Sequence, residues 1–275
     1  MVGYRAIDWH SAFARRTERM KASEIRELLK LLARPEIISF AGGIPDPALF
    51  PTKAVRSAYD AVLSDPHLAG QALQYSVSEG YGPLRSWISS YMARRGVRCG
   101  VENIVITAGS QQGLDLLGKL FLSPGDTALV TAPTYLGALQ AFNAYEPRYA
   151  SFSTSGTPSP ADHEGERVAL AYVVPDSANP TGETMEEDAR RNLLDLSAAH
   201  DAPLIEDAAY EALRFEGEPQ RSCQSLDIES CGDIDRSRVV YCGTFSKTLS
   251  PGLRVGWICA ARDLVQKVVL AKQAA

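Results

Sequence analysis

Short apolar runs alternate with amphipathic, helix-like segments from residue 103 to the end of this 275-residue chain. The runs predict strands at 103–107, 127–132, 167–174, 203–207, 238–243 and 255–260. The segments between them predict helices, among them 111–121, 134–145 and 186–200. Strands that are apolar on both faces are typical of parallel sheets covered by helices. We therefore predict an α/β fold, a three-layer sandwich around a mostly parallel sheet.

The N-terminal third shows mainly helical patterns. Ser23 is a candidate cap for a helix at 23–33, and 37–41 is a short apolar strand. Thr52 is a candidate cap for the next helix, which carries apolar residues at Val55, Tyr59 and Val62. A further helix opens at 83 and ends before Gly96.

Composition excludes several classes of function. Hydrophobic residues make up 45% of the chain and charged residues 22%, as in ordinary globular proteins. The net charge of −5 gives no bulk attraction to nucleic acid or to an anionic membrane. No apolar run approaches the ~20 residues that span a bilayer, and residues 1–19 lack the apolar core of a signal peptide. The five scattered cysteines favour a reducing cytoplasm over a disulfide framework, and they form no metal-binding motif.

Polar side chains follow four of the predicted strands. After 103–107, Ser110 and Gln111 start a helix, whose free N–H groups and dipole favour an anion. After 167–174, the segment Pro-Asp-Ser-Ala-Asn-Pro-Thr-Gly leaves the amide of Asn179 available, because the following proline disfavours the helical conformation. Each segment alone also fits an ordinary turn.

The other two strand ends carry a carboxylate and an amine. Asp207 ends the strand at 203–207, where a buried carboxylate needs a cation or donors, and Tyr210 follows. Lys247 and Arg254 follow the strand at 238–243. A helix cap, a solvated loop and a surface charge are the ordinary alternatives for Asp207, Lys247 and Arg254. Ligands of such sheets bind at the carboxyl ends of the strands. Together these groups suit pyridoxal phosphate, which needs a lysine, an acidic partner for its ring nitrogen and an anion cradle.

With these motifs the chain resembles the fold-type I pyridoxal-phosphate aminotransferases of class I and II. It is most similar to their 2-aminoadipate, kynurenine and aromatic aminotransferase subgroup. The matching motifs cover nearly the whole chain in order: SFAGGIP at 39–45, FP at 50–51, QY at 74–75, GYGPLR at 80–85, GSQQ at 109–112, APTY at 132–135, NPTG at 179–182, Asp207 with Tyr210, and SK at 246–247 with Arg254.

The resemblance implies a catalytic role for three residues. Lys247 forms the internal aldimine and moves the proton between the substrate's Cα and the cofactor's C4′. Asp207 pairs with the protonated pyridine nitrogen and keeps the ring an electron sink. Tyr210, together with Asn179, hydrogen-bonds the phenolic oxygen of the ring.

The resemblance also implies binding roles. Tyr135 stacks on the ring, and the phosphate is held by Ser110, Gln111, Ser246 and Arg254. Tyr75 reaches the phosphate of the other subunit's cofactor, which implies a homodimer with shared sites. Gly43 and Asn179 lie near the substrate. Arg85 belongs to a family motif, but a structural salt bridge is the simpler interpretation of it.

The implied reaction transfers an amino group from an α-amino acid to a 2-oxo acid by a ping-pong route. The implied domains are an N-terminal arm and substrate-side segment at 1–50 and a cofactor-binding domain at 51–275. The family continues into a small C-terminal domain from a helix that begins near Arg262, so we expect a C-terminally truncated chain without the arginine that binds the substrate's α-carboxylate. The Ser/Thr/Pro/Gly-rich segment 153–166 departs from the family pattern.

Two other functions stay open at this point. One is a fragment that binds pyridoxal phosphate but is impaired in catalysis. The other is the effector domain of an aminotransferase-like transcription regulator, although the resemblance begins within about forty residues of Met1 and leaves little room for a DNA-binding module.

Overall fold

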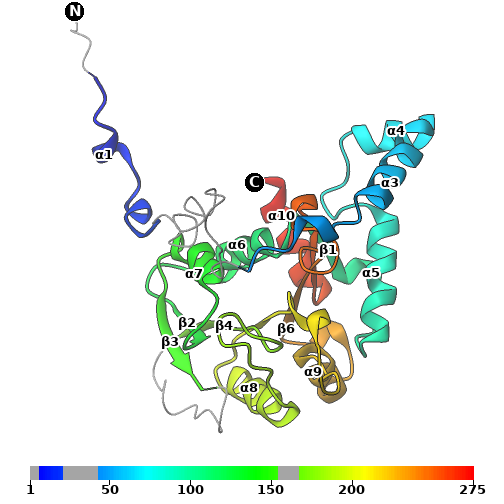
Figure 1. Ribbon diagram of the computed structural model, residues 1–275. Coiled ribbons are helices and arrows are strands. Elements are labelled where there is room, and N and C mark those ends of the chain that lie inside the picture. Colours follow the sequence, from blue (N-terminus) through cyan, green and yellow to red (C-terminus); the bar gives the residue numbers. More distant parts are fainter. Residues whose placement is uncertain (1–5, 21–42, 154–166) are drawn as a thin grey trace, which may run out of the picture.

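The computed structural model describes residues 6–20, 43–153 and 167–275, and these contain a seven-stranded sheet (Figure 1). Its strands are β1 (Ile104–Thr107), β2 (Thr127–Thr131), β3 (Arg148–Phe152), β4 (Val168–Val173), β5 (Leu204–Asp207), β6 (Val239–Thr244) and β7 (Gly256–Cys259). They lie in the order β1-β7-β6-β5-β4-β2-β3. Strand β7 runs antiparallel to β1 and β6, whereas the pairs from β6 to β3 are parallel. The prediction of a mostly parallel sheet is confirmed.

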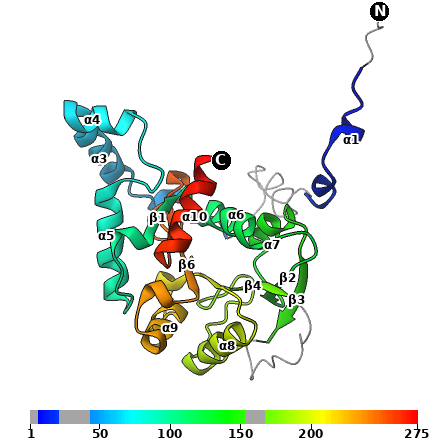
Figure 2. The same ribbon diagram turned by 180° about the vertical axis from the view of Figure 1, so that it is seen from behind.

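Helices cover both faces of the sheet (Figures 1 and 2). One face packs against α6 (Ser110–Phe121), α7 (Leu136–Asn143) and α10 (Arg262–Gln273), with Leu114, Phe142 and Val268 in its core. The opposite face packs against α8 (Glu187–Ala199), α9 (Cys223–Cys231) and α5 (Gly82–Arg94). The three-layer prediction is therefore confirmed.

The burial of the central strands explains why apolar runs in the sequence predict them. All six residues of β4 are buried, and Tyr172 belongs to the core of one face while Ala171 and Val173 belong to the other. Alternate side chains of a strand point to opposite faces, so a strand buried on both sides is apolar throughout.

Some elements differ from the predictions. Strand β3 was missed because it is an edge strand in which only Phe152 is buried. Helix α9 was missed because its residues 223–227 are all buried and show no helical periodicity. Helix α4 (Pro66–Leu73) was also missed. Two predicted helix starts are wrong in detail: Thr52 is the first residue of α3 (Thr52–Ser64) rather than its cap, and the helix predicted at 134–145 begins at Leu136 as α7.

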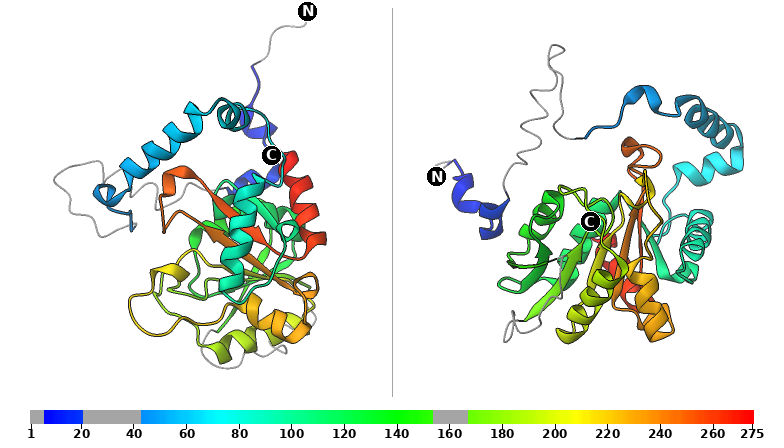
Figure 3. Two further views of the ribbon diagram at one scale, coloured as in Figure 1. Left: turned by 90° about the vertical axis from the view of Figure 1, so that its right-hand side faces the viewer. Right: turned by 60° about the horizontal axis from the view of Figure 1, so that its bottom comes forward.

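The N-terminal elements lie beside this core. None of the residues of α3 and α4 is buried by the described part of the chain, and Figure 3 shows both helices projecting from the sheet. The short helix α1 (Trp9–Ala12) precedes a 3-10 turn in which Arg15 pairs with Glu146. The predictions for 23–33 and 37–41, and for 153–166 beyond Ser153, lie outside the described residues.

Short 3-10 helices complete the described elements at Arg15–Arg19, Pro47–Leu49, Val101–Asn103, Glu211–Leu213, Ile234–Arg236 and Pro251–Leu253. Within the described ranges, no helix combines the length and the apolar character needed to cross a membrane.

Candidate active site

Loops at the carboxyl ends of β1, β5 and β6 enclose a pocket of about 160 Å³. Its lining residues are Ser110, Gln111, Tyr135, Asp207, Ala209, Tyr210, Thr244, Ser246, Lys247, Pro251 and Arg254. Eight of the residues predicted for the cofactor site are among them. The strand ends meet at one edge of the sheet, as expected for ligand sites in this class of fold.

Asp207 is the buried carboxylate of the pocket. It is 2% exposed, and its Oδ2 accepts a hydrogen bond of 2.9 Å from the hydroxyl of Tyr172 on β4. Burial raises the pKa of Asp207 to about 6, against the lowering effect of Tyr172 and of the Ala209 N–H. Its Oδ1 is buried and has no hydrogen-bond partner among the described residues. Buried polar atoms normally have a hydrogen-bond partner, so this oxygen is available to accept a hydrogen bond from a ligand. A protonated ring nitrogen is a suitable donor.

The neighbouring carboxylate of Glu206 provides an internal comparison. Glu206 is also buried, but it points to the opposite face of the sheet and accepts hydrogen bonds from the N–H groups of Cys223 and Gln224 at 2.8 and 2.9 Å. These amides belong to the first turn of α9, which favours a carboxylate. Both oxygens of Glu206 are therefore paired, which makes it a structural residue and leaves Asp207 as the candidate for ligand binding.

Asn179 does not line the pocket itself, but it contacts Tyr210, which does. The amide of Asn179 donates a hydrogen bond of 3.1 Å to the hydroxyl of Tyr210, and the Lys247 amine lies 5.6 Å from the centre of the Tyr210 ring. Burial raises the pKa of Tyr210, whereas the bond from Asn179 lowers it and Asp207 raises it. The predicted amide, phenol and amine are thus close neighbours.

The opposite side of the pocket is suited to an anion. Helix α6 begins at Ser110, and its cap residue Gly109 has a φ of +82°, which favours glycine. A Cβ on Gly109 would lie 2.5 Å from the guanidinium of Arg254, so only glycine allows this approach. Arg254 donates to the carbonyl of Ala108 at 3.0 Å, which holds its charge beside the first turn of α6.

Two further lining residues connect the pocket to α7. The amide of Gln111 donates a hydrogen bond of 2.6 Å to the carbonyl of Gly137. Tyr135 is partly buried, and burial raises its pKa to about 12, with Asp207 and Tyr210 adding to the effect and Arg254 opposing it. The Tyr135 phenol therefore stays neutral at physiological pH.

Besides Asn179, three residues singled out in the sequence lie outside this pocket. The side chain of Tyr75 is fully exposed, and Gly43 is exposed with a φ of +53°. Arg85 is structural, but it donates to the carbonyls of Ile104 and Val101 rather than to a carboxylate, so the predicted salt bridge is wrong. The described ranges also hold no group of three or more His, Cys, Asp or Glu residues that could bind a metal ion.

The sequence predictions missed three groups of the site. Tyr172 was available as the single tyrosine within the apolar run 167–174, on the same side as Asp207. Thr244 lines the pocket, and its hydroxyl lies 2.9 Å from that of Ser246. The backbone N–H of Ala209, which lowers the pKa of Asp207, could not be identified from the type of residue 209.

Comparison with known proteins agrees with this geometry. Residues 35–274 match the family model described as aminotransferase class I and II. The chain belongs to this aminotransferase family. An aromatic-amino-acid aminotransferase of Thermococcus litoralis is 41% identical to it, over 97% of this chain and 64% of that protein. The 2-aminoadipate transaminase of Thermus thermophilus is 42% identical, over 98% of this chain and 66% of that protein.

Solved structures of aminotransferases have the same fold. The crystal structure of LysN, the α-aminoadipate aminotransferase of Thermus thermophilus, complexed with N-(5'-phosphopyridoxyl)-L-leucine, matches with a TM-score of 0.84 and 39% identity. The match covers 98% of this chain and 66% of that one. The chain therefore spans about two thirds of the length of these aminotransferase relatives.

Proposed function

We propose that this protein is a pyridoxal-phosphate-dependent aminotransferase that moves an amino group from an α-amino acid to a 2-oxo acid by a ping-pong mechanism. The proposal rests mainly on Oδ1 of Asp207, which is buried without a hydrogen-bond partner in the described part of the chain and lies in a pocket that also contains Lys247. Family membership and the names of the relatives favour this function over the effector domain of a regulator.

The residues of the pocket fit the proposed cofactor. When bound, pyridoxal phosphate supplies an electron sink that makes the Cα proton of an amino acid acidic. The carboxylate of Asp207 would accept a hydrogen bond from the protonated ring nitrogen, and Asn179 and Tyr210 would hydrogen-bond the phenolic oxygen. Because Tyr210 and Tyr135 have raised pKa values, their phenols remain neutral at pH 7. Tyr135, which lines the pocket, would stack on the ring.

The start of α6 would hold the phosphate of the cofactor, and Lys247 would move the proton. Ser110, Gln111 and Ser246 would donate hydrogen bonds to the phosphate, and Arg254 would add a charge-assisted bond. The amine of Lys247 would take the proton from the substrate's Cα and return it to the cofactor's C4′, which is general acid–base catalysis.

Other assignments rest on the family resemblance and stay predictions. They are the division into an arm at 1–50 and a domain at 51–275, substrate contact at Gly43, a cytoplasmic location, and a homodimer in which Tyr75 reaches the partner's phosphate site. The full exposure of Tyr75 is compatible with a contact outside its own chain, and the five cysteines are free thiols. The relatives are named for different amino donors, so the proposal stays at the level of α-amino acids.

Absorbance of the cofactor-loaded protein tests the proposal. We expect 2-aminoadipate or an aromatic amino acid to shift the visible band of the bound cofactor to shorter wavelength, and 2-oxoglutarate to restore it. A protein that binds pyridoxal phosphate but shows neither change with a panel of amino acids would not be an aminotransferase.

We predict that Gly256→Ala damages the phosphate site through the backbone. A Cβ at this position of β7 would lie 2.6–2.9 Å from main-chain atoms of Gly109 and Ser110, which cannot rotate away. We expect the free energy of unfolding to fall by about 2 kcal/mol and the affinity for pyridoxal phosphate to fall by roughly tenfold. Urea unfolding and a fluorescence titration measure these values. Gly70→Ala, where a Cβ meets open space, is the control and should retain the affinity.

A further inference from the structure

Besides Asp207 and Glu206, a third buried carboxylate, Asp176, lies in the connection that carries Asn179. Asp176 is 3% exposed and accepts hydrogen bonds from two arginines. Arg190 binds it in a bidentate manner, with 2.9 Å to Oδ1 and 3.2 Å to Oδ2, and Arg214 donates to Oδ1 at 3.0 Å. Bidentate arginine–carboxylate pairs fix orientation as well as providing attraction.

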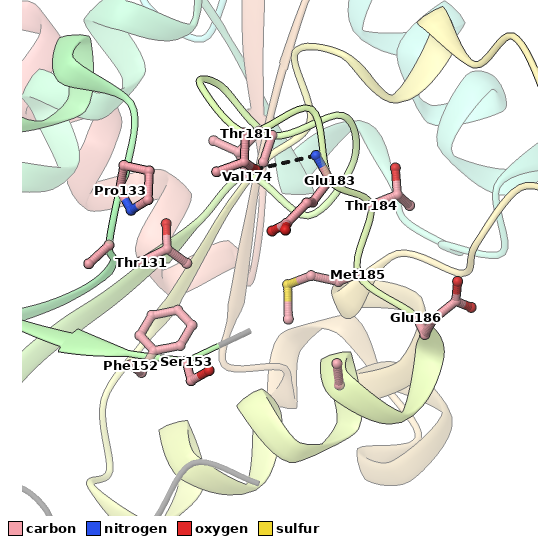
Figure 4. A pocket seen from close by; sticks show the side chains of 13 residues that line it. Thr131, Pro133, Phe152, Ser153, Val174, Thr181, Glu183, Thr184, Met185 and Glu186 are labelled. Carbon is pink, nitrogen blue, oxygen red and sulfur yellow. Dashed lines mark hydrogen bonds between the residues drawn. The ribbon is translucent and has the colours of Figure 1, made fainter. Parts of the chain in front are cut away.

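Arg190 closes the connection between β4 and α8. Its side chain is fully buried and also donates to the carbonyls of Pro175 and Met185, at 3.3 and 2.9 Å. The N–H of Met185 in turn donates to Pro175, and the N–H of Ala178 donates to Glu183, both at 2.8 Å. Figure 4 shows this connection, from Val174 to Glu186, along the wall of a neighbouring pocket of about 540 Å³. The loop with Asn179 is thus held at both of its ends.

Arg214 belongs to a different loop. It follows Tyr210 and the 3-10 helix Glu211–Leu213, on the connection after β5. Its ion pair with Asp176 therefore joins the loop of Tyr210 to the loop of Asn179 behind the pocket. At the pocket itself, the same two loops meet through the hydrogen bond between Asn179 and Tyr210.

We propose that Asp176, with Arg190 and Arg214, positions Asn179 and Tyr210 relative to each other. The inference rests on the proposed function, in which these two side chains hydrogen-bond the same oxygen of the bound ring. Two donors that converge on one atom need placement within about 0.5 Å, which a buried and bidentate ion pair provides. Asp176, Arg190 and Arg214 are positioning residues, because each acts through Asn179 or Tyr210.

Arg214→Gln is the informative variant. The Arg214 side chain is 20% exposed, and its removal leaves Asp176 paired with Arg190, so we expect the protein to fold. Arg214→Lys keeps the charge and serves as the rescue variant. Arg221→Gln removes an exposed arginine of the same neighbourhood, which pairs with Glu229, and serves as the control.

The first measurement is hydrogen exchange of the cofactor-free protein. In Arg214→Gln, the amides of Ala178, Gly182 and Leu213, which bond within the two loops, should exchange about tenfold faster. Arg214→Lys should restore most of the protection, and Arg221→Gln should leave it unchanged. Unchanged exchange at these amides in Arg214→Gln would overturn the proposed link.

The second measurement is the pH titration of the visible absorbance band of bound pyridoxal phosphate. Misplaced donors stabilise the ring's phenolate less well, so the midpoint in Arg214→Gln should rise by about half a pH unit or more. A changed exchange rate with an unchanged midpoint would overturn the positioning role. If the unsubstituted protein takes up no pyridoxal phosphate at Lys247, the proposed function fails instead, and the exchange experiment still reports on the link between the loops.

Discussion

Lys247→Ala should lower aminotransferase turnover by at least about 10³-fold while pyridoxal phosphate still binds. The variant loses the amine that moves the Cα proton, and general acid–base groups contribute about 10² to 10⁴ to rates. The variant keeps Asp207 and the anion site at the start of α6, which bind the cofactor non-covalently. We therefore expect the affinity for pyridoxal phosphate to fall only by the part that the covalent bond to Lys247 contributes. Steady-state kinetics and a fluorescence titration give the two values.

Lys267→Ala is the control for this prediction. Lys267 is an exposed lysine on α10, away from the pocket lining, and its removal should leave turnover within a factor of about two. Turnover of Lys247→Ala equal to that of the Lys267 control would assign the proton transfer to another group.

Asp207→Asn should lower turnover but raise the stability of the cofactor-free protein. The amide has the shape of the carboxylate but no charge to pair with a protonated ring nitrogen, so we expect turnover to fall by about 10² to 10³-fold. The same change removes a buried charge that burial disfavours in the cofactor-free protein. We therefore expect the cofactor-free variant to be more stable than the unsubstituted protein at pH 8.

The pH dependence of that difference follows from the pKa of Asp207. Burial raises it from 3.8 to about 6, so the folded state holds the proton more tightly than the unfolded chain does. The free energy of unfolding of the unsubstituted protein then falls as pH rises from about 4 to 6, by at most about 3 kcal/mol for this group. Asp207→Asn lacks this contribution, so the two proteins should differ most above pH 6 and least near pH 4. Urea unfolding at both pH values tests this, and a variant that is less stable at pH 8 would contradict it.

The sequence predicted the part of the fold whose burial pattern is unambiguous. The strands β4, β5 and β6 are apolar on both faces because they lie at the centre of the sheet, and the runs at 167–174, 203–207 and 238–243 predicted them. Edge strand β3 and helix α9, whose residues 223–227 are all buried, follow neither pattern, since amphipathic periodicity requires one buried and one exposed face.

The site was predictable where its residues directly follow strands. Ser110, Asp207 and Lys247 converge because parallel strands end at one edge of the sheet. The support behind these residues was not predictable. The pairing of Tyr172 with Asp207 depends on which strands are neighbours, and that of Asp176 with Arg214 depends on the path of two loops.

The most direct test of the pyridoxal-phosphate site is chemical labelling. The protein is incubated with pyridoxal phosphate, reduced with borohydride, digested and mapped by mass spectrometry. We predict one dominant label on Lys247, and its loss in Lys247→Ala. Label spread over exposed lysines such as Lys53 and Lys267, with Lys247 unmodified, would contradict the assignment of this pocket as the cofactor site.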